Sequence, residues 1–241
     1  MPSIKFDLKI GDKVLGATVN VPAEPVHLVE LLPMIQQFSD ASINAGIPDG
    51  TNVSCRSGCA ACCRQLILMA ETEAFYLADL IAEMEPDRKA VLHSRFEEIQ
   101  LKLKSLGVLE GLRQEALTDR ETRLRTSFEY MRHGLACPFL ENESCSIYEH
   151  RPLVCREYIV SSPPEHCSPA SPEPVERVMV PMYLSNALCR FGDGKGQEPV
   201  KVVALPLLPE FASAKRAEDQ PLVPGTQLFK DFFTQVTGSA D

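Results

Sequence analysis

The order of apolar and polar residues predicts a β-hairpin, several amphipathic helices and a few short extended segments. Residues 3–22 alternate apolar and polar side chains on both sides of Gly11-Asp12-Lys13, which is typical of a hairpin with a short turn. Elsewhere, apolar residues recur at intervals of three and four, which places them on one face of a helix. The helices predicted in this way span residues 26–45, 71–84, 86–106, 118–134 and 226–238.

The same periodicity gives more detailed expectations for some of these segments. In the helix over 118–134, the spacing predicts that Leu124, Phe128 and Met131 face the core. Short apolar runs are expected to be extended, with prolines favouring edge positions or irregular ends. These runs cover residues 66–69, 177–184 and 200–208.

Together these elements predict a mainly helical α+β fold, in which helices pack around an irregular, metal-stapled cysteine-rich core. We expect a single domain over residues 1–241. Within it, the pattern suggests an N-terminal hairpin and helix (1–50), a cysteine-cluster core (51–160) and a C-terminal extension (161–241).

The amino-acid composition indicates which binding partners and which cellular compartment to expect. The chain has 241 residues, of which 44% are hydrophobic, so it can bury an ordinary core. Its net charge is −9 and it has no run of Lys or Arg, so neither nucleic acid nor an anionic membrane is an expected partner. The first residues do not read as a signal peptide, and no stretch approaches the roughly 18 apolar residues of a membrane span. A cytoplasmic location is therefore expected.

Cysteine is the most informative residue type. In a reducing compartment disulfides are disfavoured, the count is odd, and adjacent cysteines pair only through a strained ring. Metal ligation is the better interpretation. The nine cysteines are Cys55, Cys59, Cys62, Cys63, Cys137, Cys145, Cys155, Cys167 and Cys189.

The first four cysteines form a C-x3-C-x2-C-C motif. Loops of two or three residues allow Cys55, Cys59 and Cys62 to converge on one centre. Cys63 is harder to place, because adjacent side chains diverge. Either the centre is larger than one ion, or Cys63 serves a second centre or a chemical task. This favours an iron–sulfur cluster, such as [4Fe–4S], over a single Zn²⁺ ion.

A second block supplies Cys137, Cys145 and Cys155, separated by eight and ten residues, with prolines that stiffen the loop between them. Seven thiols exceed the four that one structural zinc or one cubane cluster needs. The sequence therefore predicts two centres, or one centre with spare thiols. The roles of Cys167 and Cys189 stay open.

Polar residues beside the second block are candidate cofactor contacts. Arg151 and Arg156 bracket Cys155, and a positive charge there lowers a thiol pKa or favours a reduced cluster. The hydroxyl of Tyr158 can donate to a cluster sulfur or to a substrate. His150 and His166 also lie near cysteines, as possible members of a mixed site. No residue is identified as catalytic.

Two stretches, "CRSGCAACC" and "CPFLENESCSIYEHRPLVCREY", together resemble the bacterial YkgJ-type cysteine-cluster family, which carries a CxxCxxCC signature and is described as zinc- or iron-chelating. The resemblance covers about Val53 to Tyr158. It implies that the seven cysteines of the two blocks bind metal. It extends distantly to flagellin lysine N-methylase, which implies S-adenosylmethionine as a further cofactor.

The leading hypothesis is a cytoplasmic iron–sulfur protein with a redox-linked role, such as that of an oxidoreductase, or a group-transfer role. One alternative is a zinc-stapled module that binds a protein partner without catalysis. Another is an S-adenosylmethionine-dependent enzyme that acts on a protein substrate, like the lysine N-methylase. The C-x3-C-x2-C spacing also matches radical S-adenosylmethionine enzymes, but the successive helices that follow it argue against their βα barrel.

Overall fold

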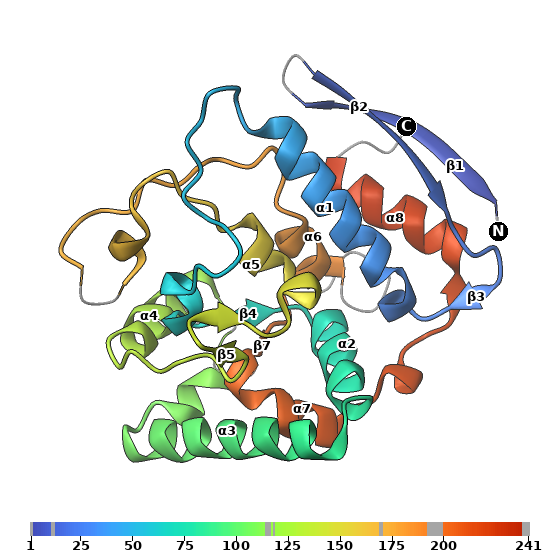
Figure 1. The fold of residues 1–241 in the computed structure, drawn as a ribbon. Helices are drawn as coiled ribbons and strands as arrows, with labels where there is room; N and C mark the ends of the chain where they lie inside the picture. The colour runs from blue at the N-terminus through green and yellow to red at the C-terminus, as the bar shows by residue number, and fades with distance from the viewer. Residues whose placement is uncertain are drawn as a thin grey trace.

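The N-terminal hairpin forms as the alternation predicts. The computed structural model describes residues 2–10, 13–113, 117, 119–168, 171–191 and 200–237, so the Gly11-Asp12 turn lies outside the described residues. Strands β1 (Ser3–Ile10) and β2 (Lys13–Asn20) pair antiparallel over their whole length. One face of the hairpin packs on the core, where the ring of Phe6 contacts those of Phe38, Phe229 and Phe233. In Figure 1 the hairpin lies along the outside of α1 and α8.

Segments from both ends of the chain build the first core. The 3₁₀ helix η1 (Leu28–Leu31) leads into α1 (Leu32–Gly46), in which Pro33 suits the first turn because it lacks an N–H. These elements pack with α6 (Leu184–Phe191) and α8 (Gly225–Thr237). The helices predicted at 26–45 and 226–238 are confirmed, with the first turn of the former being 3₁₀.

The middle of the chain builds a second core on the other side of the molecule (Figure 1). Its helices are α2 (Glu71–Ala82), α3 (Pro86–Ser105) and α7 (Leu208–Ala214), with the 3₁₀ helices η3 (Leu109–Leu112), η7 (Leu205–Leu207) and η8 (Ala217–Asp219) beside them. The predicted helices at 71–84 and 86–106 are confirmed. Helix α3 buries the apolar positions of its stripe against Phe139 and α7, which explains why it tolerates a charged outer face.

Helix α4 (Arg120–Met131) is present, but it is turned from the predicted orientation. Thr126 and Tyr130 are its buried residues, whereas Leu124 is 43% exposed and Phe128 61% exposed. The prediction that Leu124 and Phe128 face the core is therefore wrong. The helix carries a large aromatic ring at Tyr130 that fills the third core, beside Ile99 and Leu103 of α3, and this contact sets its rotation.

Short strands join parts of the chain that are far apart. The pairs are β3 (Pro25–Val26) with β8 (Val223–Pro224), β4 (Leu68–Met69) with β7 (Val203–Ala204), and β5 (Leu140–Glu141) with β6 (Ser144–Cys145). The extended runs predicted at 66–69 and 200–208 thus form strands of only two residues. In the run at 177–184, Arg177 makes a single bridge to Val160, and Leu184 already begins α6.

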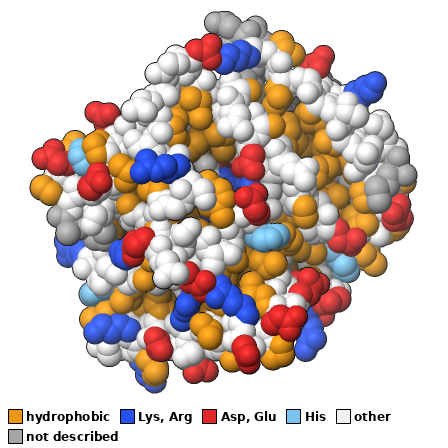
Figure 2. All heavy atoms as spheres, viewed as in Figure 1, with side chains coloured by type: hydrophobic (Ala, Val, Ile, Leu, Met, Phe, Trp, Pro, Cys, Tyr) orange, Lys and Arg blue, Asp and Glu red, His pale blue; other side chains and the backbone are white. Residues whose placement is uncertain are grey.

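The fold class is confirmed as mainly helical α+β with an N-terminal antiparallel hairpin. The surface carries acidic, basic and apolar groups side by side on the face in Figure 2, with no single charge dominating it. Within the described ranges, every helix is too short or too polar to cross a bilayer. The division into 1–50, 51–160 and 161–241 stays a prediction.

Candidate metal centre

The first cysteine loop is shaped by tight turns. Gly58 has φ +83°, a left-handed conformation that glycine adopts without steric cost, and the N–H of Cys59 donates to Arg56 O (3.0 Å) across this turn. The 3₁₀ helix η2 (Ala61–Arg64) follows and carries Cys62 and Cys63. These two turns reverse the chain twice within a few residues, so four thiols fit in a small volume.

The second cysteine loop is built from a hairpin and a short helix. Asn142 and Glu143 have φ values of 48° and 53°, as a two-residue hairpin turn requires, and the β5–β6 hairpin places Cys145 opposite Leu140. After the 3₁₀ helix η5 (Tyr148–His150), Pro152 precedes α5 (Leu153–Glu157), which carries Cys155.

Backbone contacts bring the two loops together. The N–H of Cys137 donates to Cys63 O at 2.8 Å, and the N–H of Ser54 donates to Val160 O at 2.9 Å. On the surface, the Arg64 guanidinium forms two hydrogen bonds with the Glu143 carboxylate, the shorter at 2.7 Å. Segments between about 70 and 110 residues apart in sequence are thus joined to each other at these three points.

Six of the seven predicted thiols line one cavity of about 100 Å³ between these loops, and the seventh, Cys55, lines an adjoining groove. The six are Cys59, Cys62, Cys63, Cys137, Cys145 and Cys155. In the part of the chain that the structure describes, no three His, Cys, Asp or Glu side chains stand close enough to hold an ion as they are. The thiols share a cavity without converging on one point, so binding requires their side chains to move inward.

The sulfur atoms already receive backbone hydrogen bonds. The N–H of Val160 donates to Cys55 Sγ at 3.4 Å. The N–H of Phe139 lowers the pKa of Cys137, and that of Ile147 lowers the pKa of Cys145, each by hydrogen bonding to the sulfur, although burial outweighs both. N–H···S bonds stabilise thiolates bound to metal. This donor set of clustered sulfurs therefore fits a thiophilic metal centre.

Burial sets the proton affinity of most of these thiols. It raises the pKa of Cys137 to about 12 and that of Cys155 well above the ordinary value. Cys62 is the exception: a hydrogen bond from the Cys63 thiol lowers its pKa to about 7, and the same bond raises the pKa of Cys63. Most of the thiols are thus protonated at neutral pH, and a metal cation is needed to ionise them.

Of the predicted cofactor contacts, Arg151 and Tyr158 line the thiol cavity. The Arg151 guanidinium lies over the Tyr148 ring, 3.6 Å from its centroid, and its Nε donates to Tyr148 O at 3.0 Å. Burial raises the pKa of Cys55, Cys145 and Cys155, and the Arg151 charge opposes each rise. Arg151 is therefore held in place as a fixed positive charge beside the sulfurs.

Arg156 is placed differently from its neighbour. It is buried beside the adjoining groove, where its guanidinium bonds Asp40 at 2.5 Å, Arg151 O at 2.9 Å and Glu149 O. Arg156 thus stabilises the backbone at Arg151 through its hydrogen bond to Arg151 O. Its contact with a cofactor stays a prediction.

The histidines near the cysteines have other partners. His150 Nδ1 lies 2.7 Å from the Tyr76 hydroxyl, and His166 Nδ1 lies 3.0 Å from Pro174 O. Sequence reasoning missed Gln65, whose amide donates to the Tyr158 hydroxyl at 3.4 Å and to Cys167 O at 3.5 Å. Nothing in the sequence singles out this glutamine, apart from its place two residues after Cys63.

A buried carboxyl holds the helix that carries Cys155. Glu157 accepts hydrogen bonds from the N–H of Ser185, at 3.0 Å, and from its hydroxyl. Burial raises its pKa to about 7, and the Ser185 bonds offset only part of that rise. The folded state therefore binds more protons than the unfolded state between pH about 4.5 and about 7.

This carboxyl predicts a pH dependence of stability. As the pH rises from 5.5 to 8, Glu157 ionises in its buried position, so the wild-type free energy of unfolding should fall by about 2 kcal/mol from this group. Urea unfolding of wild type and Glu157→Gln at several pH values checks this. The wild-type free energy of unfolding minus that of Glu157→Gln should fall as the pH rises, and a difference that does not depend on pH would contradict the assignment.

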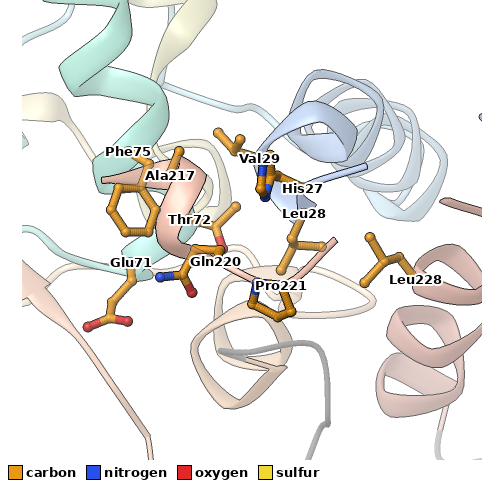
Figure 3. Close-up of a pocket in the computed structure, with 10 residues that line it drawn as sticks. All are labelled: His27, Leu28, Val29, Glu71, Thr72, Phe75, Ala217, Gln220, Pro221 and Leu228. Atoms are coloured by element: carbon orange, nitrogen blue, oxygen red, sulfur yellow. The ribbon is translucent and has the colours of Figure 1, made fainter. Parts of the chain in front are cut away.

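A second pocket lies away from the thiols, lined from η1, α2, α8 and the turn after η8 (Figure 3). His27, Thr72 and Gln220 are its main polar side chains, and no cysteine lines it. Its volume is about 10 Å³, which is room for about one water molecule. It is a packing gap between the two cores and adds nothing to the metal centre.

Comparison with known proteins agrees with the cysteine geometry. A family model named CxxCxxCC, described as "Putative zinc- or iron-chelating domain", matches residues 54–173. No curated protein and no solved structure matched the chain. The match covers both cysteine loops and supports the binding of zinc or iron. Residues 54–173 of this chain belong to the CxxCxxCC cysteine-cluster family.

Proposed function

We propose that this protein binds an iron–sulfur cluster between the loop at 55–63 and the loop at 137–155, in a redox-linked or group-transfer role. The observation that carries this proposal is that thiols from both loops line one cavity beside the fixed charge of Arg151. A cluster supplies a site for one-electron transfer or for activation of a bound substrate.

Three features favour a cluster over a single zinc ion. The thiols outnumber the four that zinc takes, and the adjacent pair Cys62 and Cys63 both line the cavity. The cavity of about 100 Å³ is larger than one ion needs. The positive charge of Arg151 offsets the negative charge of a thiolate-bound cluster and favours its reduced form.

For a group-transfer reaction, the adjoining groove is the binding site that we propose for a second substrate. Its volume is about 310 Å³, it is lined by Cys55, and it shares Cys155 and Arg151 with the thiol cavity. Asp40 and Asn44 of α1 form its polar wall, and Ile43 and Ile47 its apolar wall. S-adenosylmethionine is the substrate that the family resemblance suggests for it, and a protein substrate or partner remains part of the proposal.

Anaerobic purification followed by counting of iron, zinc and acid-labile sulfide tests the proposal. We expect a coloured protein with iron and sulfide in equal amounts and a visible absorption that bleaches when dithionite is added. Cys189→Ala is the matched control, because Cys189 packs in the first core and lines neither the thiol cavity nor the adjoining groove. A colourless protein that contains stoichiometric zinc and no sulfide would overturn the proposal in favour of a zinc-stapled binding module.

A further inference from the structure

Cys167 follows both cysteine-rich segments in the sequence, but in the structure it lies close to the first of them. It ends the 3₁₀ helix η6 (Pro164–Cys167), which packs against η2, and its residue is only 5% exposed. The Gln65 amide donates to Cys167 O at 3.5 Å, just after η2. The family match, which extends to residue 173, also includes Cys167.

The surroundings of Cys167 are those of a thiol that belongs to the first loop. Burial, with the charges of the first-loop thiols, raises its pKa to about 11, and a hydrogen bond from the Tyr158 hydroxyl offsets part of that rise. Cys55 contacts the same tyrosine, because its Sγ donates to Tyr158 O at 3.8 Å. Tyr158 therefore links Cys55 of the first loop to Cys167. Cys55 in turn is influenced by Cys62 and Cys59 among the thiols.

The remaining four thiols, Cys63, Cys137, Cys145 and Cys155, all line the cavity between the two loops. Cys137 is tied to Cys63 by the backbone bond of 2.8 Å, and Cys63 is influenced by Cys137 and Cys145. Cys155 is influenced by Cys137 and Cys145 as well as by Cys62. Cys62 thus stands at the boundary between the groups.

The two groups also rest on different parts of the core. Cys137 and Cys145 pack against the second core, which contains Phe96 and Phe139. Cys55 packs instead on a separate cluster that includes Ile43 and Ile159. Sulfurs anchored on different cores are poorly placed to meet at a single point.

We propose that Cys167 is an eighth metal-binding thiol and that the eight thiols form two neighbouring four-thiolate centres. The first comprises Cys55, Cys59, Cys62 and Cys167, and the second comprises Cys63, Cys137, Cys145 and Cys155. This accounts for the adjacent cysteines, because each of the two thiols then serves a different centre. Cysteines that are close in sequence but bind different clusters occur in two-cluster ferredoxins. The inference rests on the metal binding of the proposed function, and each thiol releases its proton to solvent as it binds.

Two single substitutions test the division. Cys167→Ser should remove only the first centre and Cys145→Ser only the second, so each variant should retain about half of the metal that anaerobically purified wild type carries. Cys189→Ala should retain all of it. Metal per chain is counted for every variant, together with far-ultraviolet circular dichroism to confirm the fold.

If a variant fails to fold, a titration of the demetallated wild-type chain with Co²⁺ under anaerobic, reducing conditions gives a second readout. We expect thiolate-to-cobalt absorption to saturate at two ions per chain. Saturation at one ion, or a Cys167→Ser protein with the full metal content of wild type, would overturn the two-centre division. Two zinc ions without sulfide, halved by each variant, would uphold the division while rejecting the iron–sulfur cluster.

Discussion

Removal of the metal is expected to unfold both cysteine loops and to lower the free energy of unfolding by at least about 5 kcal/mol, given that structural metal sites contribute about 10–16 kcal/mol in small domains. The loops have little else to order them. Apart from β5, β6 and the short helix α5, their described residues form only single turns and short 3₁₀ segments, and few backbone hydrogen bonds join one loop to the other. Without a metal, protonated thiols stay buried around the cavity and the strong sulfur–metal bonds are absent.

Hydrogen exchange measured by mass spectrometry, before and after anaerobic chelation with reductant present, checks this prediction. Exchange should rise sharply over residues 51–66 and 133–168 and stay slow in α8 and the β1–β2 hairpin, which pack on each other through Phe6, Phe229 and Phe233. The hairpin and α8 are therefore an internal control. Equal exchange in both states, or an unchanged unfolding midpoint, would show that the fold does not depend on metal.

The helices were predictable because each buries a stripe whose period is visible in the sequence. Apolar side chains of α3 at Leu92, Phe96, Ile99 and Leu103 are all buried, as their spacing requires. The orientation predicted for α4 was wrong because Leu124 and Phe128 compete with Tyr130 for burial in the core. A periodicity of three and four residues cannot decide between two faces that both carry apolar groups.

The convergence of the two cysteine blocks could be expected from thiol chemistry, but its detail could not. The bond from Cys137 to Cys63 O and the Arg64–Glu143 pair depend on how the hairpin at 140–145 folds back. The position of Cys167 depends on a proline-rich segment without periodicity. Long-range contacts of this kind leave no local pattern, so the sequence could not assign a role to Cys167. Nor could it show that the Arg156 guanidinium bonds Asp40 and Arg151 O.

A buried glutamate at the start of α2 ties the second core to the helix that carries Cys155. One carboxylate oxygen of Glu73 accepts from the N–H of Ala70 at 3.0 Å and so caps α2, and the other accepts from the N–H of Leu153 at 2.6 Å. Glu73 is 1% exposed, and its pKa is raised by burial, which the two backbone bonds partly offset. Its removal would leave two buried donors without partners.

Glu73→Ala is therefore expected to lower the free energy of unfolding by about 2–5 kcal/mol and to reduce the metal content, because each unsatisfied buried donor costs roughly 1–3 kcal/mol. Glu73→Gln retains one acceptor oxygen and should fall between wild type and Glu73→Ala. The matched control is Glu30→Ala: Glu30 accepts from the N–H of His27, also three residues earlier, at 2.9 Å, but it is exposed. Urea unfolding of the four proteins, with metal counted in each, measures the effect. If Glu30→Ala and Glu73→Ala lose equal stability, the bond to Leu153 contributes nothing, and α5 must be held in place by its packing and by the hydrogen bonds of Glu157 and Arg156.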